Sequence, residues 1–121
     1  MLLSGQLEPQ QLALEITEHH LLKHYKQLKS RLLKLHKAGF TLIVDQVGLV
    51  IDNALYVDEL PLESVKLHPS VVRNINQHLE QQLFVRGLIS GYAGKGVKVI
   101  ATGVELEDEW LTLQKLGIAG G

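Results

Sequence analysis

The sequence predicts an α/β fold in which helices pack outside a parallel β-sheet. Four short apolar runs have the length and composition of strands that are covered on both faces. Longer segments with a helical spacing of apolar residues separate these runs. About four β–α units result, and crossovers of roughly 20 residues fit either an open doubly wound sheet or part of a (β/α)8 barrel.

The first half of the chain is expected to contain two strands and one long helix. The strands are residues 12–16 and 41–45, and each has a carboxylate at or next to its last residue, Glu15 and Asp45. Between them, apolar residues recur at spacings of four and three, namely Leu21, Tyr25, Leu28, Leu32 and Leu35, which is typical of a helix with one buried face. The helix begins at residue 17 or 18, and Gly39 is placed for a left-handed cap that ends it.

The second half continues the alternation with two more strands, residues 64–68 and 97–101. Pro61 ends a less regular segment, residues 47–60, that is read as a loop and a short helix. The remaining helices are expected at residues 70–75, 79–92 and 107–116. The last of these starts with three acidic residues, the charge that a helix N-terminus favours.

Composition excludes several classes of protein. The chain has 121 residues, of which 45% are hydrophobic and 21% charged, so it suits one globular domain and not a disordered or collagen-like chain. The absence of cysteine excludes disulfides, thiolate zinc sites and a cysteine nucleophile. A formal net charge of −1 gives no overall basic character. No apolar run is long enough to span a membrane and the N-terminus does not resemble a signal peptide, so a cytoplasmic location is expected.

Polar residues lie at the carboxyl end of every expected strand: Glu15, Asp45, Lys66 with His68, and Thr102 with Glu105. In parallel α/β folds these ends converge on one rim, where binding and catalytic sites are built. Two or three carboxylates there could hold Mg²⁺, and a lysine could stabilise a phosphate. The alternative is that the chain simply emerges into water at these positions.

Half of the basic residues lie in the first long helix, with no acidic residue from His19 to Ala38. Either this is a solvated helix face or it docks an acidic partner or RNA. The histidines at positions 20 and 24 are one helical turn apart, and we expect them to be solvated surface residues and not metal ligands. The candidate interaction face consists of Lys23, Lys26, Lys29, Arg31, Lys34 and Lys37.

Five motifs in order resemble the second half of an EAL domain, the cyclic-di-GMP phosphodiesterase family. They are Leu14-Glu15-Ile16-Thr17-Glu18, Asp45-Gln46-Val47-Gly48, Leu60-Pro61-Leu62 with Lys66-Leu67-His68, Ala101-Thr102-Gly103-Val104-Glu105, and Leu116-Gly117. The resemblance implies a TIM-type (β/α)8 barrel. Residues 1–121 would be its C-terminal portion, a partial and degenerate EAL domain whose N-terminal half lies outside this sequence.

The resemblance also assigns roles to residues. Glu15 and Asp45 correspond to metal ligands, and Glu18 corresponds to a glutamate that braces the active-site loop. Lys66 corresponds to the catalytic lysine and Glu105 to the last glutamate of an E-G-V-E motif.

Departures from the family pattern imply that this site is vestigial and that the domain is not an enzyme. Gln46 replaces the second of two adjacent aspartates, and Thr102 replaces the first glutamate of E-G-V-E. His68 replaces an aspartate, and residues 48–53 are apolar where the family loop is polar and rich in glycine. A two-metal hydrolysis needs its carboxylates to hold both cations. No cofactor is therefore expected, and Mg²⁺ or Mn²⁺ would be needed only for residual phosphodiesterase activity.

A narrower resemblance links the chain to bacterial regulators of the carbon-storage-regulator D and MSHA-biogenesis H types. It rests on Lys66-Leu67-His68, Gln82-Leu83-Phe84-Val85-Arg86, and Ala101–Glu105 followed by Trp110. Such regulators carry degenerate GGDEF and EAL domains and are tethered to the inner membrane by other segments. The resemblance implies a role in small-RNA turnover. The resemblance also implies two possible protein partners, the RNA-degradation machinery and the glucose-specific phosphotransferase component.

Three functions therefore stay open at this point: a non-catalytic interaction module, a weak cyclic-di-GMP phosphodiesterase, and a receptor that binds cyclic-di-GMP without cutting it. In the first, the apolar loop from Leu49 to Ile51 could pack on a partner. Because four parallel strands leave two open edges, the isolated fragment is expected to form a homo-oligomer.

Overall fold

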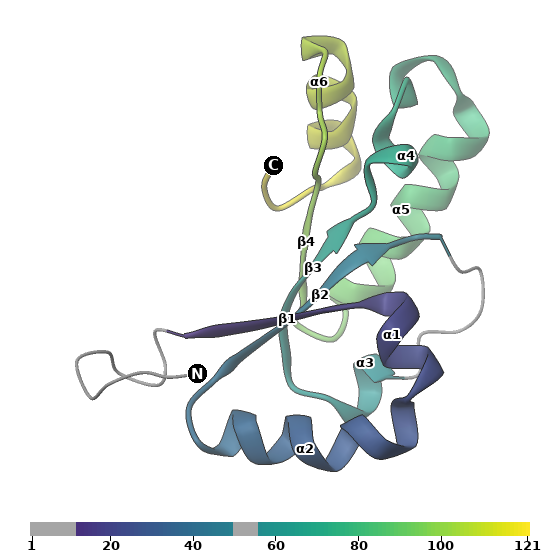
Figure 1. Cartoon of the computed structure of the whole chain (residues 1–121). Coiled ribbons are helices and arrows are strands. Elements are labelled where there is room, and N and C mark those ends of the chain that lie inside the picture. Colours follow the sequence, from purple (N-terminus) through teal and green to yellow (C-terminus); the bar gives the residue numbers. More distant parts are fainter. Residues whose placement is uncertain (1–11, 50–55) are drawn as a thin grey trace.

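The computed structural model describes residues 12–49 and 56–121, which form a partial α/β barrel (Figure 1). Its sheet has four parallel strands in the order β1-β2-β3-β4, so strands that follow one another in sequence are also neighbours in space. Each is connected to the next by a crossover that contains helices, as expected. The strands are β1 (Ala13–Thr17), β2 (Thr41–Val47), β3 (Leu62–Leu67) and β4 (Lys98–Ile100).

The last two helices, α5 (Leu79–Ala93) and α6 (Glu107–Leu116), agree with the expected segments to within one residue, and the earlier helices differ from them. The expected single helix after β1 is two helices, because His24 leaves the helical conformation with φ −120° and ψ 30°. The expected helix over residues 70–75 was also too long, since Arg73 is extended and Asn74 is left-handed. The elements are α1 (Glu18–Lys23), α2 (Tyr25–Lys37), α3 (Tyr56–Glu59), α4 (Pro69–Val72), the 3₁₀ helix η2 (Ile75–Gln77), α5 (Leu79–Ala93) and α6 (Glu107–Leu116).

The core lies between one face of the sheet and the helices. A row of apolar side chains crosses all four strands, because Ile16 is in register with Val44, Val44 with Val65, and Val65 with Val99. The last three of these are almost completely buried. Buried residues of the helices complete the same core, among them Leu21, Leu32, Val85, Ile89 and Leu113. Because side chains alternate along a strand, the intervening residues point to the opposite face.

The two edges of the sheet differ. β1 pairs only with β2, and β4 pairs with β3 on one side. On the other side of β4, Ala101 donates a hydrogen bond to Gly120 at 2.8 Å, and Ala119 donates one to Val99 at 2.9 Å. The end of the chain therefore runs parallel to β4 and partly covers an edge that was expected to be open. Within the described ranges, no helix is long and apolar enough to cross a membrane.

Candidate functional site

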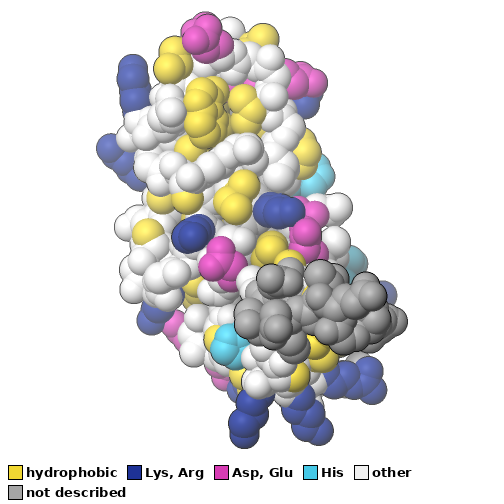
Figure 2. All heavy atoms as spheres, turned by 90° about the vertical axis from the view of Figure 1, so that its left-hand side faces the viewer, with side chains coloured by type: hydrophobic (Ala, Val, Ile, Leu, Met, Phe, Trp, Pro, Cys, Tyr) yellow, Lys and Arg dark blue, Asp and Glu magenta, His cyan; other side chains and the backbone are white. Residues whose placement is uncertain are grey.

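The carboxyl ends of the strands bring Glu15 and Lys66 together. Glu15 of β1 and Lys66 of β3 both lie on the sheet face away from the core, on either side of β2. The Lys66 Nζ atom is 2.9 Å from Glu15 Oε1, and the two side chains are 29% and 42% exposed. The predicted strand-end rim therefore contains a solvent-accessible ion pair. Figure 2 shows a face of the molecule on which acidic, basic and hydrophobic side chains lie beside one another.

Asp45 and Gln46 lie where β2 departs from regular strand geometry. The register with β3 shifts between Val44 and Val47, and Gln46 has a positive φ of 55°. The Gln46 backbone N–H donates a 2.7 Å hydrogen bond to Asp45 Oδ1, while the Gln46 side chain is exposed. One carboxylate oxygen of Asp45 is thus occupied by the backbone of the residue that follows it.

Glu18 is buried at the start of α1, with 4% of its surface exposed. Its Oε1 atom accepts a 3.4 Å hydrogen bond from the Gly48 N–H, just after β2. Its Oε2 atom accepts a hydrogen bond from the Tyr56 hydroxyl. The Tyr92 hydroxyl lies 2.8 Å from that of Tyr56, and because Tyr56 donates to Glu18, Tyr92 donates to Tyr56. This chain of hydrogen bonds fixes the first residue of the loop after β2 to α1, α3 and α5.

Burial keeps both tyrosines of this network protonated. Desolvation raises the pKa of Tyr92 to about 12, and the pKa of Tyr56 is raised further by burial and by the neighbouring Tyr92 and Glu18. Both hydroxyls therefore remain hydrogen-bond donors at any physiological pH. Gly48 is required here, because its φ is +111° and a Cβ atom would lie 2.6 Å from Val71 Cγ2.

The remaining strand-end candidates have separate partners. Thr102 Oγ1 donates a 2.6 Å hydrogen bond to the Leu67 carbonyl, which ties the end of β4 to β3. His68 precedes α4, and its Nδ1 atom accepts a 3.1 Å hydrogen bond from the Ser70 N–H. Glu105 Oε1 lies 3.4 Å from Arg73 Nη1. In the described part of the chain, no three His, Asp or Glu side chains are grouped so that they could hold one metal ion.

One buried carboxylate in this region is Glu109, which the sequence indicated only as an acidic residue in the first turn of α6. Its side chain accepts three backbone hydrogen bonds, from Asn74 at 2.8 Å, Glu105 at 2.9 Å and Leu106 at 3.1 Å. These hydrogen bonds hold the pKa of Glu109 below its usual value. The signal for this role is a glutamate three residues after the helix N-cap, the reciprocal half of a capping box.

The candidate interaction face on α1 and α2 is less uniformly basic than the sequence indicates. Lys29 Nζ lies 3.1 Å from Glu59 Oε2, and the Tyr25 hydroxyl donates to the other oxygen of Glu59, so α3 supplies an acidic partner. These two contacts lower the pKa of Glu59. The other five basic residues are exposed and form no ion pair with any described residue, namely Lys23, Lys26, Arg31, Lys34 and Lys37.

The apolar loop that could pack on a partner was expected to run from Leu49 to Ile51. Of these residues only Leu49, which is 53% exposed, lies within the described part of the chain.

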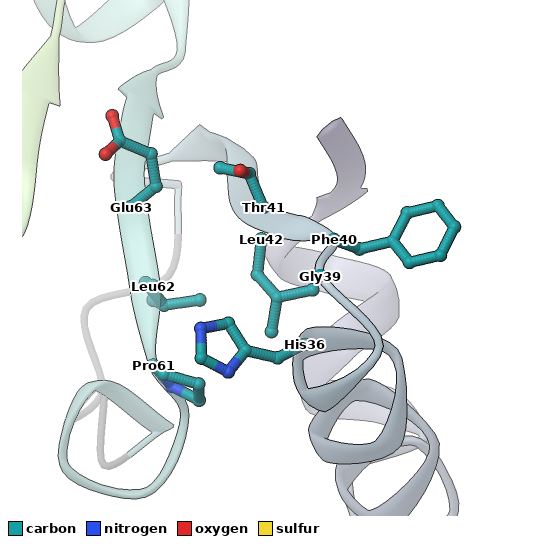
Figure 3. Close-up of a pocket in the computed structure, with 8 residues that line it drawn as sticks. All are labelled: His36, Gly39, Phe40, Thr41, Leu42, Pro61, Leu62 and Glu63. Atoms are coloured by element: carbon teal, nitrogen blue, oxygen red, sulfur yellow. The ribbon is translucent and has the colours of Figure 1, made fainter. Parts of the chain in front are cut away.

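A separate hollow of about 510 Å³ lies at the amino ends of β2 and β3, the opposite end from the polar rim (Figure 3). The His36 ring points toward Pro61 and Leu62 across it, while Phe40 points away. The lining residues are His36, Gly39, Phe40, Thr41, Leu42, Pro61, Leu62 and Glu63. The lining of this hollow differs from the polar rim at the carboxyl ends of the strands, because it contains one carboxylate, Glu63, and no lysine.

Comparison with known proteins identifies related sequences and structures. The family model described as EAL domain matches residues 1–121. The RNase E specificity factor CsrD of Escherichia coli is 35% identical over 108 residues, which are 89% of this chain and 17% of that protein. A cyclic di-GMP phosphodiesterase of Pseudomonas aeruginosa is 30% identical over 110 residues, 91% of this chain and 19% of that protein. The chain thus spans less than a fifth of the length of these relatives.

Two solved structures show the same fold. The PaMucR phosphodiesterase in complex with c-di-GMP superposes with a TM-score of 0.84 at 25% identity, over 93% of this chain and 45% of that one. BlrP1 of Klebsiella pneumoniae, in a complex with manganese and cyclic-di-GMP, gives a TM-score of 0.85 at 28% identity, over 93% of this chain and 29% of that one. The partial barrel therefore corresponds to less than half of each of these chains.

Proposed function

Because the chain belongs to the EAL domain family, we propose that it is a non-catalytic module of cyclic-di-GMP signalling that regulates through a bound partner. The observation that carries the proposal is the 2.9 Å ion pair between Lys66 and Glu15. In this pair the positive charge of Lys66 is balanced by the negative charge of Glu15, so the Glu15 carboxylate is directed at the lysine. A two-metal hydrolytic site needs carboxylates that converge on the cations and on an activated water.

The donor set at the rim does not fit a pair of metal ions. Gln46 carries a neutral amide next to Asp45, and a neutral amide is a poor bridge between two divalent cations. Glu105 pairs with Arg73, and Asp45 accepts a hydrogen bond from its own neighbour. We therefore assign no hydrolytic step to these residues, and the roles of Glu15, Asp45, Lys66 and Glu105 are those of a vestigial site.

The likeness to a specificity factor for RNase E supports a protein partner from the RNA-degradation machinery. A glucose-specific phosphotransferase component is the other proposed protein partner, on the sequence resemblance alone. Both proposals are tested by the same binding experiment. The purified protein is titrated with each candidate partner by calorimetry, and absence of heat with both would exclude them.

Hydrolysis is tested by incubating the protein with cyclic-di-GMP and Mn²⁺ and measuring the linear dinucleotide. We expect no product above that of the Lys66→Ala variant. Product that disappears in Lys66→Ala would overturn the non-catalytic assignment. Restoring the carboxylates with Gln46→Asp and Thr102→Glu is expected to leave partner binding unchanged, since a non-catalytic module does not need metal-binding carboxylates.

A receptor for cyclic-di-GMP is the second candidate function. It is favoured by the position of Lys66, which is partly exposed on the rim and carries a charge that suits a phosphate. Two of the structural neighbours are described as complexes with this nucleotide. Calorimetric binding without product, weakened by Lys66→Ala, would establish a receptor and would leave the non-catalytic assignment standing.

A further inference from the structure

The outer face of α1 and α2 carries a row of cations. On α2, Lys26, Ser30, Lys34 and Lys37 follow one another at spacings of four, four and three, which places them on one side of the helix. At 1.5 Å per residue, the lysines at the ends of this stripe are about 16 Å apart along the axis. Arg31 lies one turn before Lys34, and Lys23 of α1 lines a shallow hollow together with Lys26. These five basic residues, Lys23, Lys26, Arg31, Lys34 and Lys37, are called the cationic row. Figure 2 shows basic side chains that extend outward at the lower end of the molecule, where Figure 1 places α2.

A hollow flanks the cationic row on the side of α1. It has a volume of about 520 Å³ and is lined by His20, His24, Gln27, Leu28 and Arg31. The rings of the two histidines are adjacent, with centroids 4.8 Å apart and planes inclined by 56°. Arg31 belongs to both the row and the hollow. Flat side chains and an amide are thus placed directly beside the cations.

The surroundings of the cationic row argue against a lipid surface. A helix that binds a membrane interface turns its apolar face toward the lipid. On α2 that face is already used, since Leu32 is buried and Tyr25 and Leu28 pack against the core. Leu33 is the large apolar residue of α2 that is notably exposed, at 38%. This helix therefore has no apolar face to insert.

An acidic protein surface also fits the row poorly. The centres of protein–protein interfaces are depleted of lysine and are built around apolar and aromatic residues. The row has lysines at its centre. A phosphate backbone, in contrast, needs only spaced cations, and an unpaired strand can also stack its bases on histidine and arginine side chains.

We propose that the cationic row and the adjacent hollow bind single-stranded nucleic acid, with the row contacting phosphates and the hollow receiving a base. The proposal rests on the interaction-module function and names the chemistry of one partner. It does not involve the strand-end rim, so RNA binding and cyclic-di-GMP turnover can be measured separately. Failure of one does not bear on the other.

The test is fluorescence anisotropy with a fluorescein-labelled 20-nucleotide RNA of mixed sequence, at several salt concentrations. With four to five phosphate contacts, the slope of log affinity against log salt is expected to be about −3. The Lys34→Ala/Lys37→Ala variant should bind at least tenfold more weakly and reduce the slope by about 1.4, two contacts at about 0.7 each. The matched control, Lys98→Ala/Lys115→Ala, removes two exposed lysines elsewhere and should bind as the unmodified protein does.

Two further variants separate direct contacts from effects on folding. Lys34→Arg/Lys37→Arg keeps both charges and should retain the affinity. His24→Ala should lower the affinity about fivefold, because it removes a ring on which a base can stack, and should change the salt slope less than the Lys34→Ala/Lys37→Ala variant does. Equal binding by the Lys34→Ala/Lys37→Ala variant and the unmodified protein would overturn the proposal. So would binding to vesicles with 20% phosphatidylserine, or to polyglutamate, in the absence of RNA binding.

Discussion

Replacement of Glu109 by glutamine should destabilise the fold strongly, although glutamine has nearly the same size and shape. Its side chain is fully buried and joins two segments, because it accepts hydrogen bonds from the N–H group of Asn74, before η2, and from those of Glu105 and Leu106, before α6. Glu109 Oε1 accepts the hydrogen bonds from Glu105 and Leu106, and Oε2 accepts the one from Asn74. A glutamine amide has one oxygen, so one set of N–H groups must face its NH₂ group.

The magnitude follows from these three hydrogen bonds. A hydrogen bond to a charged group contributes roughly 1.5–3 kcal/mol, and one between neutral groups about 1 kcal/mol. In the better orientation, Glu109→Gln loses the bond from Asn74 and weakens the two from Glu105 and Leu106. The sum is about 3 kcal/mol, a large part of the roughly 5–15 kcal/mol that stabilises a small domain.

The effect should depend on pH. The pKa of Glu109 is lowered in the folded protein from its ordinary value of 4.5, chiefly by the hydrogen bonds from Asn74 and Glu105. The stabilisation is therefore complete above pH 4.5 and is lost as the pH falls through the lower pKa of the folded state. Glutamine does not titrate. Urea unfolding followed by circular dichroism should show a difference between the two proteins that is constant from pH 7 to 5 and narrows toward pH 3.

Glu107→Gln is the matched control, since Glu107 is an exposed glutamate in the same helical turn. It removes one favourable charge from the N-terminus of α6 and should cost about 0.5 kcal/mol. A difference below 1 kcal/mol for Glu109→Gln at pH 7 would refute the estimate. A difference that stays the same down to pH 3 would show that the carboxylate charge is not its source.

Three other substitutions have defined outcomes in the same unfolding assay. Gly87→Ala should stabilise the protein by about 0.5–1 kcal/mol, because Gly87 is within a helix and a Cβ atom there meets no described atom within 4 Å. Gly103→Ala should destabilise it, since φ is +73° and the Cβ atom would lie 2.6 Å from Pro69 Cβ; equal effects of the two alanines would contradict this reasoning. Tyr92→Phe removes the donor to Tyr56 and should cost about 1 kcal/mol, whereas a neutral result would mean that this hydrogen bond adds no net stability.

The sequence predicted those elements that depend on local patterns. α6 begins and ends where its acidic first turn and its final glycine indicate, and α5 differs from the expected segment by one residue. The parallel direction of the strands followed from the β–α alternation, whereas their sequential order followed only from the resemblance to a (β/α)8 barrel family, because the alternation alone also fits a doubly wound sheet. Glu15 and Lys66 lie near the carboxyl ends of their strands, so they could be predicted to lie on the same rim of the sheet.

Contacts between distant segments could not be predicted in this way. Glu59 reaches Lys29 and Tyr25 from α3, so the basic helix has an acidic neighbour that lies more than 20 residues away in sequence. The division of the first helix at His24 has no marker such as proline or glycine. The acceptor role of Glu109 likewise depends on Asn74, which η2 brings close from another part of the chain.

The network around Glu18 shows how the protein positions the start of the segment after β2. Glu18, Tyr56 and Tyr92 hold the Gly48 N–H through side chains and backbone alone, and neither Asp45 nor Gln46 takes part in these bonds. The start of the loop after β2 is thus positioned by contacts that need no metal ion. A buried carboxylate is costly unless it is hydrogen-bonded, so the network stabilises the buried Glu18 and holds Gly48 next to α1. The proposed binding of a ligand or partner at the rim would therefore use a backbone position that the protein itself holds in place, and Glu18→Gln should weaken that binding.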